Sequence, residues 1–197
     1  RTNGNVKFRA YFSAAMGGAK EIFPSISSGM VHLGYSRTMY YPGKFHLATI
    51  DELPFTGYQM DARQKAYLKL VEEFPELKAE FEKQNMKFLS PLQSNAPALA
   101  SKKHITTVEG WKGEKIRGGG TGAILIKAWG GVPVSLATAN IYEAIARGTV
   151  VGAFGFPPAT MIAYGLHEVS DYFLDPGTGA LGMLSFVMNK KAYEKLP

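Results

Sequence analysis

The sequence predicts an α/β protein with two lobes, each built around its own sheet. Short strand-like segments alternate with helix-like segments along most of the 197 residues. A helix–glycine–strand pattern at residues 21–34 occurs again at residues 141–153, once in each half of the chain. The hydrophobic content of 46% is sufficient to form real cores. Because helix–glycine–strand joints are common in all α/β proteins, a single sheet remains an alternative.

In the first half of the chain, hydrophobic periodicity and capping patterns indicate the elements. Apolar residues alternate with Lys7 and Arg9, which predicts a strand at the start. Asp61 and Gln64 form a capping-box pattern that opens the longest helix, and Pro75 should kink or split that helix. The expected elements are a strand at 6–12, a helix at 19–28, a strand at 31–35, a helix at 61–84, and strands at 86–91 and 96–102.

In the second half, short apolar runs bounded by glycine alternate with helical segments. The expected elements are a strand at 115–117, a helix at 121–129, a strand at 132–136, a helix at 140–147, strands at 149–154, 168–174 and 183–188, and a helix at 190–195. Because helices of this length join the strands, the sheets are expected to be largely parallel.

Composition excludes several classes of function. The 22 Lys and Arg residues exceed the 16 Asp and Glu residues, but no block of like charge stands out, so no nucleic-acid partner is expected. The absence of cysteine excludes disulfides, thiolate chemistry and cysteine-based zinc sites. No apolar run approaches the roughly 20 residues that span a bilayer. The four histidines are isolated from one another, so neither a metal site nor a cofactor is expected.

Arg117 is the strongest candidate for binding a ligand. It ends a short predicted strand and is followed by Gly118, Gly119 and Gly120. A guanidinium matches a carboxylate through two parallel hydrogen bonds, and glycines allow a ligand to approach the backbone amides. The alternative is an ordinary exposed arginine before a flexible turn. The glycines do not form a P-loop, because no lysine follows until Lys127.

Other candidates are aromatic or polar residues at strand ends. Phe154 and Phe156 flank Gly155, and the two-residue period of a strand places both rings on one face, where they would wall an apolar pocket or fill the core. Two triplets of polar residues would either bind a ligand or form turns. One is Gln93, Ser94 and Asn95, and the other is Tyr35, Ser36 and Arg37.

Several segments together resemble one known family. They include V-E-G-W-K-G-E-K-I-R, G-G-V-P-V, I-Y-E-A-I-A-R-G-T-V-V-G and F-V-M-N-K-K-A-Y-E-K-L-P, preceded by G-G-A-K-E-I-F, S-G-M-V-H-L-G-Y, Y-P-G-K-F-H-L and E-L-P-F. In this order they resemble the solute-binding proteins of TRAP transporters, the DctP-like periplasmic family. The resemblance implies a two-lobed Venus-flytrap fold, with lobe I formed by residues 1–94 and about 184–197 and lobe II by residues 95–183.

The resemblance also implies roles for individual residues. Arg117 corresponds to the family's carboxylate-binding arginine, and Thr138 to another ligand position. The segment that contains Phe154, Gly155 and Phe156 would supply further contacts, and Gln93, Asn95 and Tyr35 would line the cleft from the first lobe.

The chain departs from the family pattern in its ligand segment and in its length. Val151 replaces an aspartate, and Pro157-Pro158-Ala159 stands where many members have Pro-Trp-Glu. These departures favour an apolar monocarboxylate over a dicarboxylate. Family members usually have a further strand and helix at the start, and further strands and a long helix at the end. Either the chain is a fragment or the sequence does not include the ends of the protein. At full length we expect a monomer, and we expect its precursor to carry a signal peptide.

The expected function is that of a periplasmic solute-binding protein and not of an enzyme. It would capture a small organic carboxylate in the cleft between the lobes and deliver it to a TRAP permease in the membrane. Two alternatives remain open. One is an α/β enzyme in which Arg117 orients a small carboxylate substrate, and the other is a sensor domain with the same fold.

Overall fold

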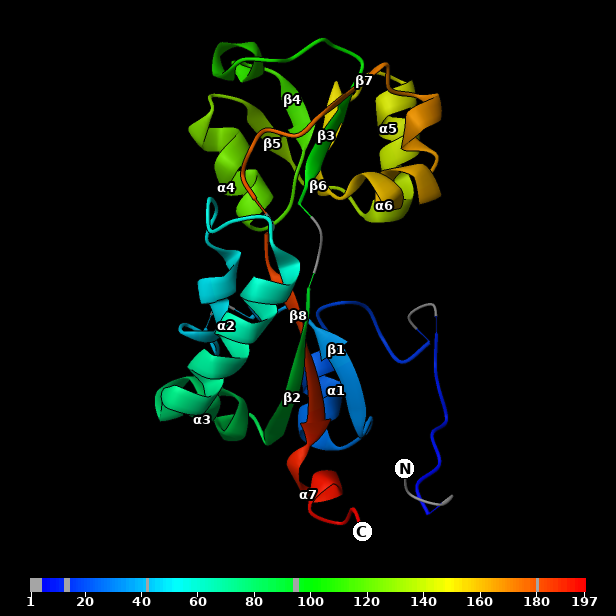
Figure 1. The fold of residues 1–197 in the computed structure, drawn as a ribbon. Coiled ribbons are helices and arrows are strands. Elements are labelled where there is room, and N and C mark those ends of the chain that lie inside the picture. The colour runs from blue at the N-terminus through cyan, green and yellow to red at the C-terminus, as the bar shows by residue number, and fades with distance from the viewer. Residues whose placement is uncertain (1–4, 13–14, 42, 94–95, 180) are drawn as a thin grey trace. The chain divides into compact units, whose positions relative to one another are not determined.

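A computed structural model describes residues 5–12, 15–41, 43–93, 96–179 and 181–197 (Figure 1). The chain forms two compact units and passes between them several times. The first unit comprises Arg1–Asp51, Asp61–Gln93 and Gly182–Pro197, and the second comprises Glu52–Met60 and Ser94–Leu181.

Residues 52–60 differ from the predicted lobe boundaries, because they group with the second unit. Hydrogen bonds to distant residues of the second unit connect this segment to that unit. The backbone N–H of Phe55 donates to the Thr178 carbonyl at 2.7 Å, and the Tyr58 hydroxyl donates to the Asp175 carboxylate at 3.3 Å. Contacts between residues more than 100 positions apart cannot be read from local sequence patterns.

The first unit contains a three-stranded sheet in the order β1 (Leu33–Ser36), β8 (Met183–Asn189), β2 (Met86–Gln93). Both pairs are antiparallel. The parallel arrangement predicted from helix–strand alternation is therefore wrong for this sheet. It assumed that successive strands pair with each other, whereas β8 comes from the end of the chain and lies between β1 and β2.

Helices pack on this sheet around one hydrophobic core. α1 (Ile22–Ser28) accommodates Pro24 in its first turn, where a backbone donor is not needed. Pro75 splits the predicted long helix into α2 (Met60–Glu73) and α3 (Pro75–Lys83), as expected. The core contains Phe23, Ile26, Phe45, Tyr67, Phe81, Met86 and Val187. The unit also contains α7 (Lys190–Tyr193) and two 3-10 helices, η1 (Thr38–Tyr40) and η2 (Ala48–Glu52).

The second unit contains a five-stranded sheet in the order β5 (Val132–Val134), β4 (Lys115–Arg117), β6 (Gly152–Phe156), β3 (Ala98–Ser101), β7 (Tyr172–Leu174). β4 pairs parallel with β5 and β6, whereas β3 pairs antiparallel with β6 and β7. The parallel prediction therefore holds only for the part of the sheet that carries Arg117.

Helices cover both faces of this sheet, so the second unit has three layers (Figure 1). On one face, α4 (Thr121–Ala128) and η3 (Val108–Trp111) enclose Leu99, Ile116 and Phe154. On the other face, the core includes residues of α5 (Ile141–Ala146), α6 (Pro158–Ala163) and η5 (Leu166–Glu168), packed around Ala98, Ala100 and Ala153. α6 was not among the predicted elements. η4 (Thr138–Asn140) leads directly into α5.

The strand predicted at residues 6–12 is not present, because residues 7–12 form neither helix nor strand and are exposed. Apolar–polar alternation creates a strand only where a neighbouring strand supplies hydrogen bonds. Within the described residues, no helix combines the length and the apolar character that crossing a membrane requires.

Candidate ligand-binding site

Arg117 lies at the carboxyl end of β4, in the parallel part of the second unit's sheet. Here β4 pairs with β5 through Arg117 and Val134, and with β6 through Arg117 and Ala153. In α/β proteins, ligands commonly bind beyond the carboxyl ends of such parallel strands. The predicted candidate Arg117 therefore lies at the edge of the sheet that is best suited to a binding site.

The half-buried side chain of Arg117 contacts the Leu136 backbone and the Phe156 ring, among other groups. Its Nε and Nη2 atoms both donate to the backbone carbonyl of Leu136, at 3.4 Å each. Its guanidinium carbon lies 4.6 Å from the centroid of the Phe156 ring. A cation above an aromatic face is stabilised by about 0.5–2 kcal/mol, depending on how well water is excluded. One edge and one face of the guanidinium are thus held by the protein.

A β-bulge in β6 determines where the two predicted phenylalanines point. Phe156 pairs with Ala98 and Phe154 pairs with Leu99, so Gly155 is an extra residue without a partner in β3. Phe154 packs in the core on the α4 side, whereas Phe156 packs with the residues of the opposite face. The prediction that both rings share one face is wrong, because it assumed an uninterrupted two-residue period.

Phe154 fills the core of the second unit. It is 0% exposed, and its ring lies 5.6 Å from Trp111 and 5.7 Å from Trp129, measured between centroids. The structure therefore shows the core-filling alternative for this residue. Of the two phenylalanines, only Phe156 lies against Arg117.

The three glycines after Arg117 have different structural roles. A Cβ atom on Gly118 would lie 2.3 Å from Cδ1 of Ile126, so the buried turn has no room for a side chain there. Gly120 has a φ of +54° and caps the start of α4, a conformation that favours glycine. Gly119 is exposed, and a Cβ atom added there would have no other atom within 4 Å. The open approach to the backbone is thus at Gly119.

Glu52 is a neighbour of this turn that was not among the predicted site residues. Its carboxylate is buried and accepts a hydrogen bond from the hydroxyl of Thr121, the first residue of α4, at 3.4 Å. The only sequence signal was its place in the E-L-P-F segment. The contact of the Leu136 carbonyl with Arg117 was not predicted either. Every residue type carries the same backbone oxygen, so the sequence gives no signal for such a contact.

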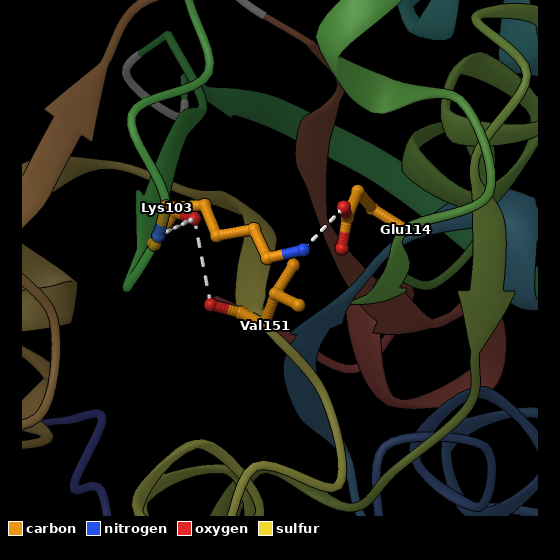
Figure 2. Close-up of polar contacts among 4 residues, drawn as sticks. Lys103, Glu114 and Val151 are labelled. Carbon is orange, nitrogen blue, oxygen red and sulfur yellow. Dashed lines mark hydrogen bonds and ion pairs between the residues drawn. The ribbon is translucent and has the colours of Figure 1, made fainter.

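Val151 lies at the other end of the parallel strands, just before β6 begins. Its carbonyl accepts hydrogen bonds from the Lys102 amide at 2.9 Å and the Ser101 hydroxyl at 3.4 Å. Figure 2 shows this edge, where Lys103 Nζ lies 2.6 Å from Glu114 Oε1. The Val151 amide donates to the Lys115 carbonyl at 2.8 Å, and its side chain packs against the core on the α4 side. Val151 therefore lies beside the start of β4, whereas Arg117 lies at the end of that strand.

The remaining predicted site residues are distributed over both units. Thr138 begins η4 and is half-buried, two residues after the carbonyl that binds Arg117. Tyr35 is 55% exposed on β1, and the backbone of Gln93 pairs with Met183 at the end of β2, both in the first unit. Asn95 lies outside the described residues. In the part of the chain that the structure describes, no three His, Asp or Glu side chains gather as a metal ion would require.

Comparison with known proteins gives consistent results for sequence and structure. Residues 1–197 match the family described as "Bacterial extracellular solute-binding protein, family 7". A solute-binding protein of Verminephrobacter eiseniae is 26% identical over 203 residues, which cover 100% of this chain and 58% of the relative.

Solved structures with this fold come from several bacteria. A TRAP periplasmic solute-binding protein of Bordetella bronchiseptica with bound (R)- and (S)-mandelate has a TM-score of 0.84 and 26% identity, covering 100% of this chain and 62% of its own. A TRAP periplasmic solute-binding protein from Desulfovibrio salexigens, in an open complex, has a TM-score of 0.85 and 24% identity, and the match covers 100% of this chain and 60% of that protein. A Bordetella pertussis receptor binding pyroglutamic acid has a TM-score of 0.83 and 18% identity, and the match covers 100% of this chain and 64% of the receptor. The chain thus spans about three fifths of these relatives, and the predicted two-lobed α/β class is confirmed.

Proposed function

Because this chain belongs to the family 7 bacterial extracellular solute-binding proteins, we propose that it binds a small organic acid in the periplasm and delivers it to a TRAP-type membrane permease. The chain would select and carry the ligand without changing it chemically. The proposal includes closure of the two lobes over the ligand, as the resemblance implies.

The position of Arg117 is the observation that carries this proposal. Its guanidinium lies at the carboxyl ends of parallel strands and is held by the Leu136 carbonyl and the Phe156 ring. A charge-assisted hydrogen bond to a carboxylate contributes about 1.5–3 kcal/mol when water is excluded. The exposed Gly119 beside it leaves the backbone accessible to the same ligand.

An apolar monocarboxylate is the ligand class that we favour. Two of the groups in contact with Arg117 are an aromatic ring and a carbonyl oxygen, and neither would pair with a second carboxylate. The Bordetella bronchiseptica protein with bound mandelate, an aromatic monocarboxylate, is 26% identical to this chain. Pyroglutamate, orotate and glucuronate are bound by other proteins of the same fold.

The test is calorimetric titration with mandelate, pyroglutamate, orotate, glucuronate and galacturonate. We expect at least one monocarboxylate to bind the wild type, and Arg117→Met to weaken that binding by at least about 100-fold, because two charge-assisted bonds are lost. Arg147→Met is the matched control, since Arg147 is a 78% exposed arginine of the same unit that pairs with Glu143. Equal binding by wild type and Arg117→Met would contradict the assignment.

Lobe closure and chemical turnover of the ligand require separate measurements. Small-angle scattering of the wild type should show a smaller radius of gyration when the bound acid is present, because closure compacts the molecule. Turnover of the acid, followed by mass spectrometry, would instead favour the enzyme alternative.

A further inference from the structure

We propose that the β-bulge at Gly155 and the ring of Phe156 together position Arg117. Gly155 and Phe156 are then positioning residues for the guanidinium that binds the ligand. The inference rests on the proposed function, because it assumes that Arg117 binds the ligand. It assigns the aromatic ring to the arginine, whereas the sequence resemblance assigned this segment to the ligand.

The register of β6 provides the first argument. Ala153 lies on the sheet face covered by α5 and α6, and Phe154 lies on the α4 face. In a regular strand, Phe156 would follow Phe154 to the α4 face, because side chains alternate with a period of two. The extra residue Gly155 reverses this order and returns Phe156 to the α5 and α6 face.

The direction of Arg117 provides the second argument. In β4, Ile116 is buried on the α4 face, so Arg117 points toward the opposite face, where Leu136 also packs. β4 and β6 are neighbours in the sheet, and the bulge therefore places the Phe156 ring 4.6 Å from the guanidinium carbon. Without the bulge, the ring and the guanidinium would lie on opposite faces.

The conformation of Gly155 explains why this residue is glycine. Its φ is +112°, a backbone conformation that residues with a side chain rarely adopt. A Cβ atom added to Gly155 would have no other atom within 4 Å. A substitution there would therefore strain the backbone without causing a steric clash. Relief of that strain requires the strand to lose or move the bulge, which turns Phe156 away from Arg117.

The functional consequence is preorganisation of the arginine. Arginine side chains lose rotamer freedom when they bind, and that loss weakens binding. The ring of Phe156, which also lies 6.1 Å from the ring of Tyr164, restricts the guanidinium before the ligand arrives. The carboxylate therefore meets a guanidinium whose orientation is already set.

The experiment uses the whole chain and the variants Gly155→Ala, Phe156→Leu and Phe156→Tyr. Gly148→Ala is the matched control, because Gly148 has a φ of +72° and open space around an added Cβ, but follows α5. Circular dichroism first establishes that each variant folds. The first readout is the NMR resonance of the Arg117 Nε–H group without ligand, since an aromatic ring this close shifts it. The second is the Kd for (S)-mandelate and for pyroglutamate.

We expect Phe156→Leu and Gly155→Ala to remove the ring-induced shift of the Arg117 resonance and to weaken binding about 10-fold, which corresponds to about 1.4 kcal/mol. Phe156→Tyr keeps the ring and should retain both properties, as should Gly148→Ala. A purely structural role for Phe156 would lower stability without moving the Arg117 resonance.

An unchanged Arg117 resonance in folded Phe156→Leu would overturn the role of the ring, and an unchanged resonance in folded Gly155→Ala would overturn the role of the bulge. If Gly155→Ala does not fold, Phe156→Leu and Phe156→Tyr still decide whether the ring positions Arg117. If the wild type binds neither acid, the proposed function loses support, while the Nε–H resonance decides the positioning inference by itself.

Discussion

The side-chain carboxylate of Asp51 accepts a hydrogen bond from the backbone N–H of Met183, although 132 residues separate them in sequence. The Asp51 carbonyl also accepts bonds from the Gly182 amide at 3.1 Å and from Nη2 of Arg63 at 2.8 Å. Asp51 is the last residue of the first unit before the chain first passes to the second, and Gly182 is the residue at which the chain returns for the last time. Asp51 therefore joins three separate segments of the first unit.

Replacement of Asp51 should destabilise the protein by an amount that depends on the acceptor left for Met183. Asp51→Ala leaves this N–H without its acceptor and should lower the free energy of unfolding by about 1–3 kcal/mol. Asp51→Asn keeps an acceptor oxygen and should lower it less. Urea denaturation measures both, with Asp171→Ala as the control because Asp171 is exposed. A loss with Asp51→Ala no larger than that of the control would contradict this role.

The buried hydroxyl of Tyr67 should make stability fall at alkaline pH. It donates to the Ala48 carbonyl at 2.9 Å, and burial, together with the charge of Asp51, raises the pKa of Tyr67 well above the usual range of tyrosine. Above about pH 10 the unfolded chain ionises this group while the folded protein does not. The stabilisation is therefore complete below pH 10 and is lost as pH rises, by about 1.4 kcal/mol per pH unit.

The measurement compares unfolding free energies of wild type and Tyr67→Phe between about pH 9 and pH 11. Other tyrosines and lysines titrate in both proteins, so the difference between the two curves isolates Tyr67. We expect the alkaline slope to be smaller in Tyr67→Phe. Tyr172→Phe, at a residue that is 43% exposed, should keep the wild-type slope. Identical slopes for wild type and Tyr67→Phe would refute the pKa argument.

Local features were predictable from the sequence, whereas features that depend on distant partners were not. The strand at 115–117 and the division of the long helix at Pro75 follow from nearby residues, and the structure confirms both. The strand at 6–12 was predicted from local alternation, which does not show whether a partner strand is present. The lobe boundaries implied by the resemblance did not include the contacts of residues 52–60 with remote segments.

The candidate site shows the same limit at finer scale. Arg117 was identified from its chemistry, but its contacts were not, because they involve a backbone carbonyl and a ring redirected by a bulge. A signal for the bulge was nevertheless present. An isolated glycine within a strand pattern, here Gly155 between two phenylalanines, often marks a bulge, and this signal should have outweighed simple alternation.

Glu80 should stabilise the segment that precedes α2 through three backbone hydrogen bonds. From α3 its carboxylate accepts bonds from the amides of His46 at 2.8 Å, Leu47 at 2.9 Å and Ala48 at 2.9 Å, at the start of η2. Glu80→Gln removes the charge and converts one acceptor into a donor. We expect a loss of about 1–3 kcal/mol in unfolding free energy and faster hydrogen exchange of these three amides.

Glu82→Gln is the matched control, because Glu82 lies in the same helix and is exposed, at 3.8 Å from Lys78. Ion pairs of this kind contribute about 0–1 kcal/mol, so the control should change stability little. Unaltered exchange of the His46, Leu47 and Ala48 amides in Glu80→Gln would show that the carboxylate does not hold this segment.

The tight turn after Arg117 should tolerate no side chain at Gly118, and removal of one methyl group should partly relieve the clash. A Cβ on Gly118 would lie 2.3 Å from Cδ1 of Ile126, which is itself fully buried. Gly118→Ala should therefore lower the unfolding free energy by about 1–3 kcal/mol, as overpacking does in other cores. Ile126→Val removes Cδ1 and alone should cost about 0.5–1.5 kcal/mol.

The double variant tests this mechanism, because valine provides the space that alanine needs. Its loss of stability should be smaller than the sum of the two single losses, by at least about 0.5 kcal/mol, as expected for residues in direct contact. Gly119→Ala, at an open position, should change stability by less than about 0.5 kcal/mol. Strict additivity of the stability losses of Gly118→Ala and Ile126→Val would show that Ile126 is not the obstacle. The loss of stability in Gly118→Ala would then arise from the backbone atoms of α4, since the amide nitrogen of Ala123 would lie 3.3 Å from the new methyl group.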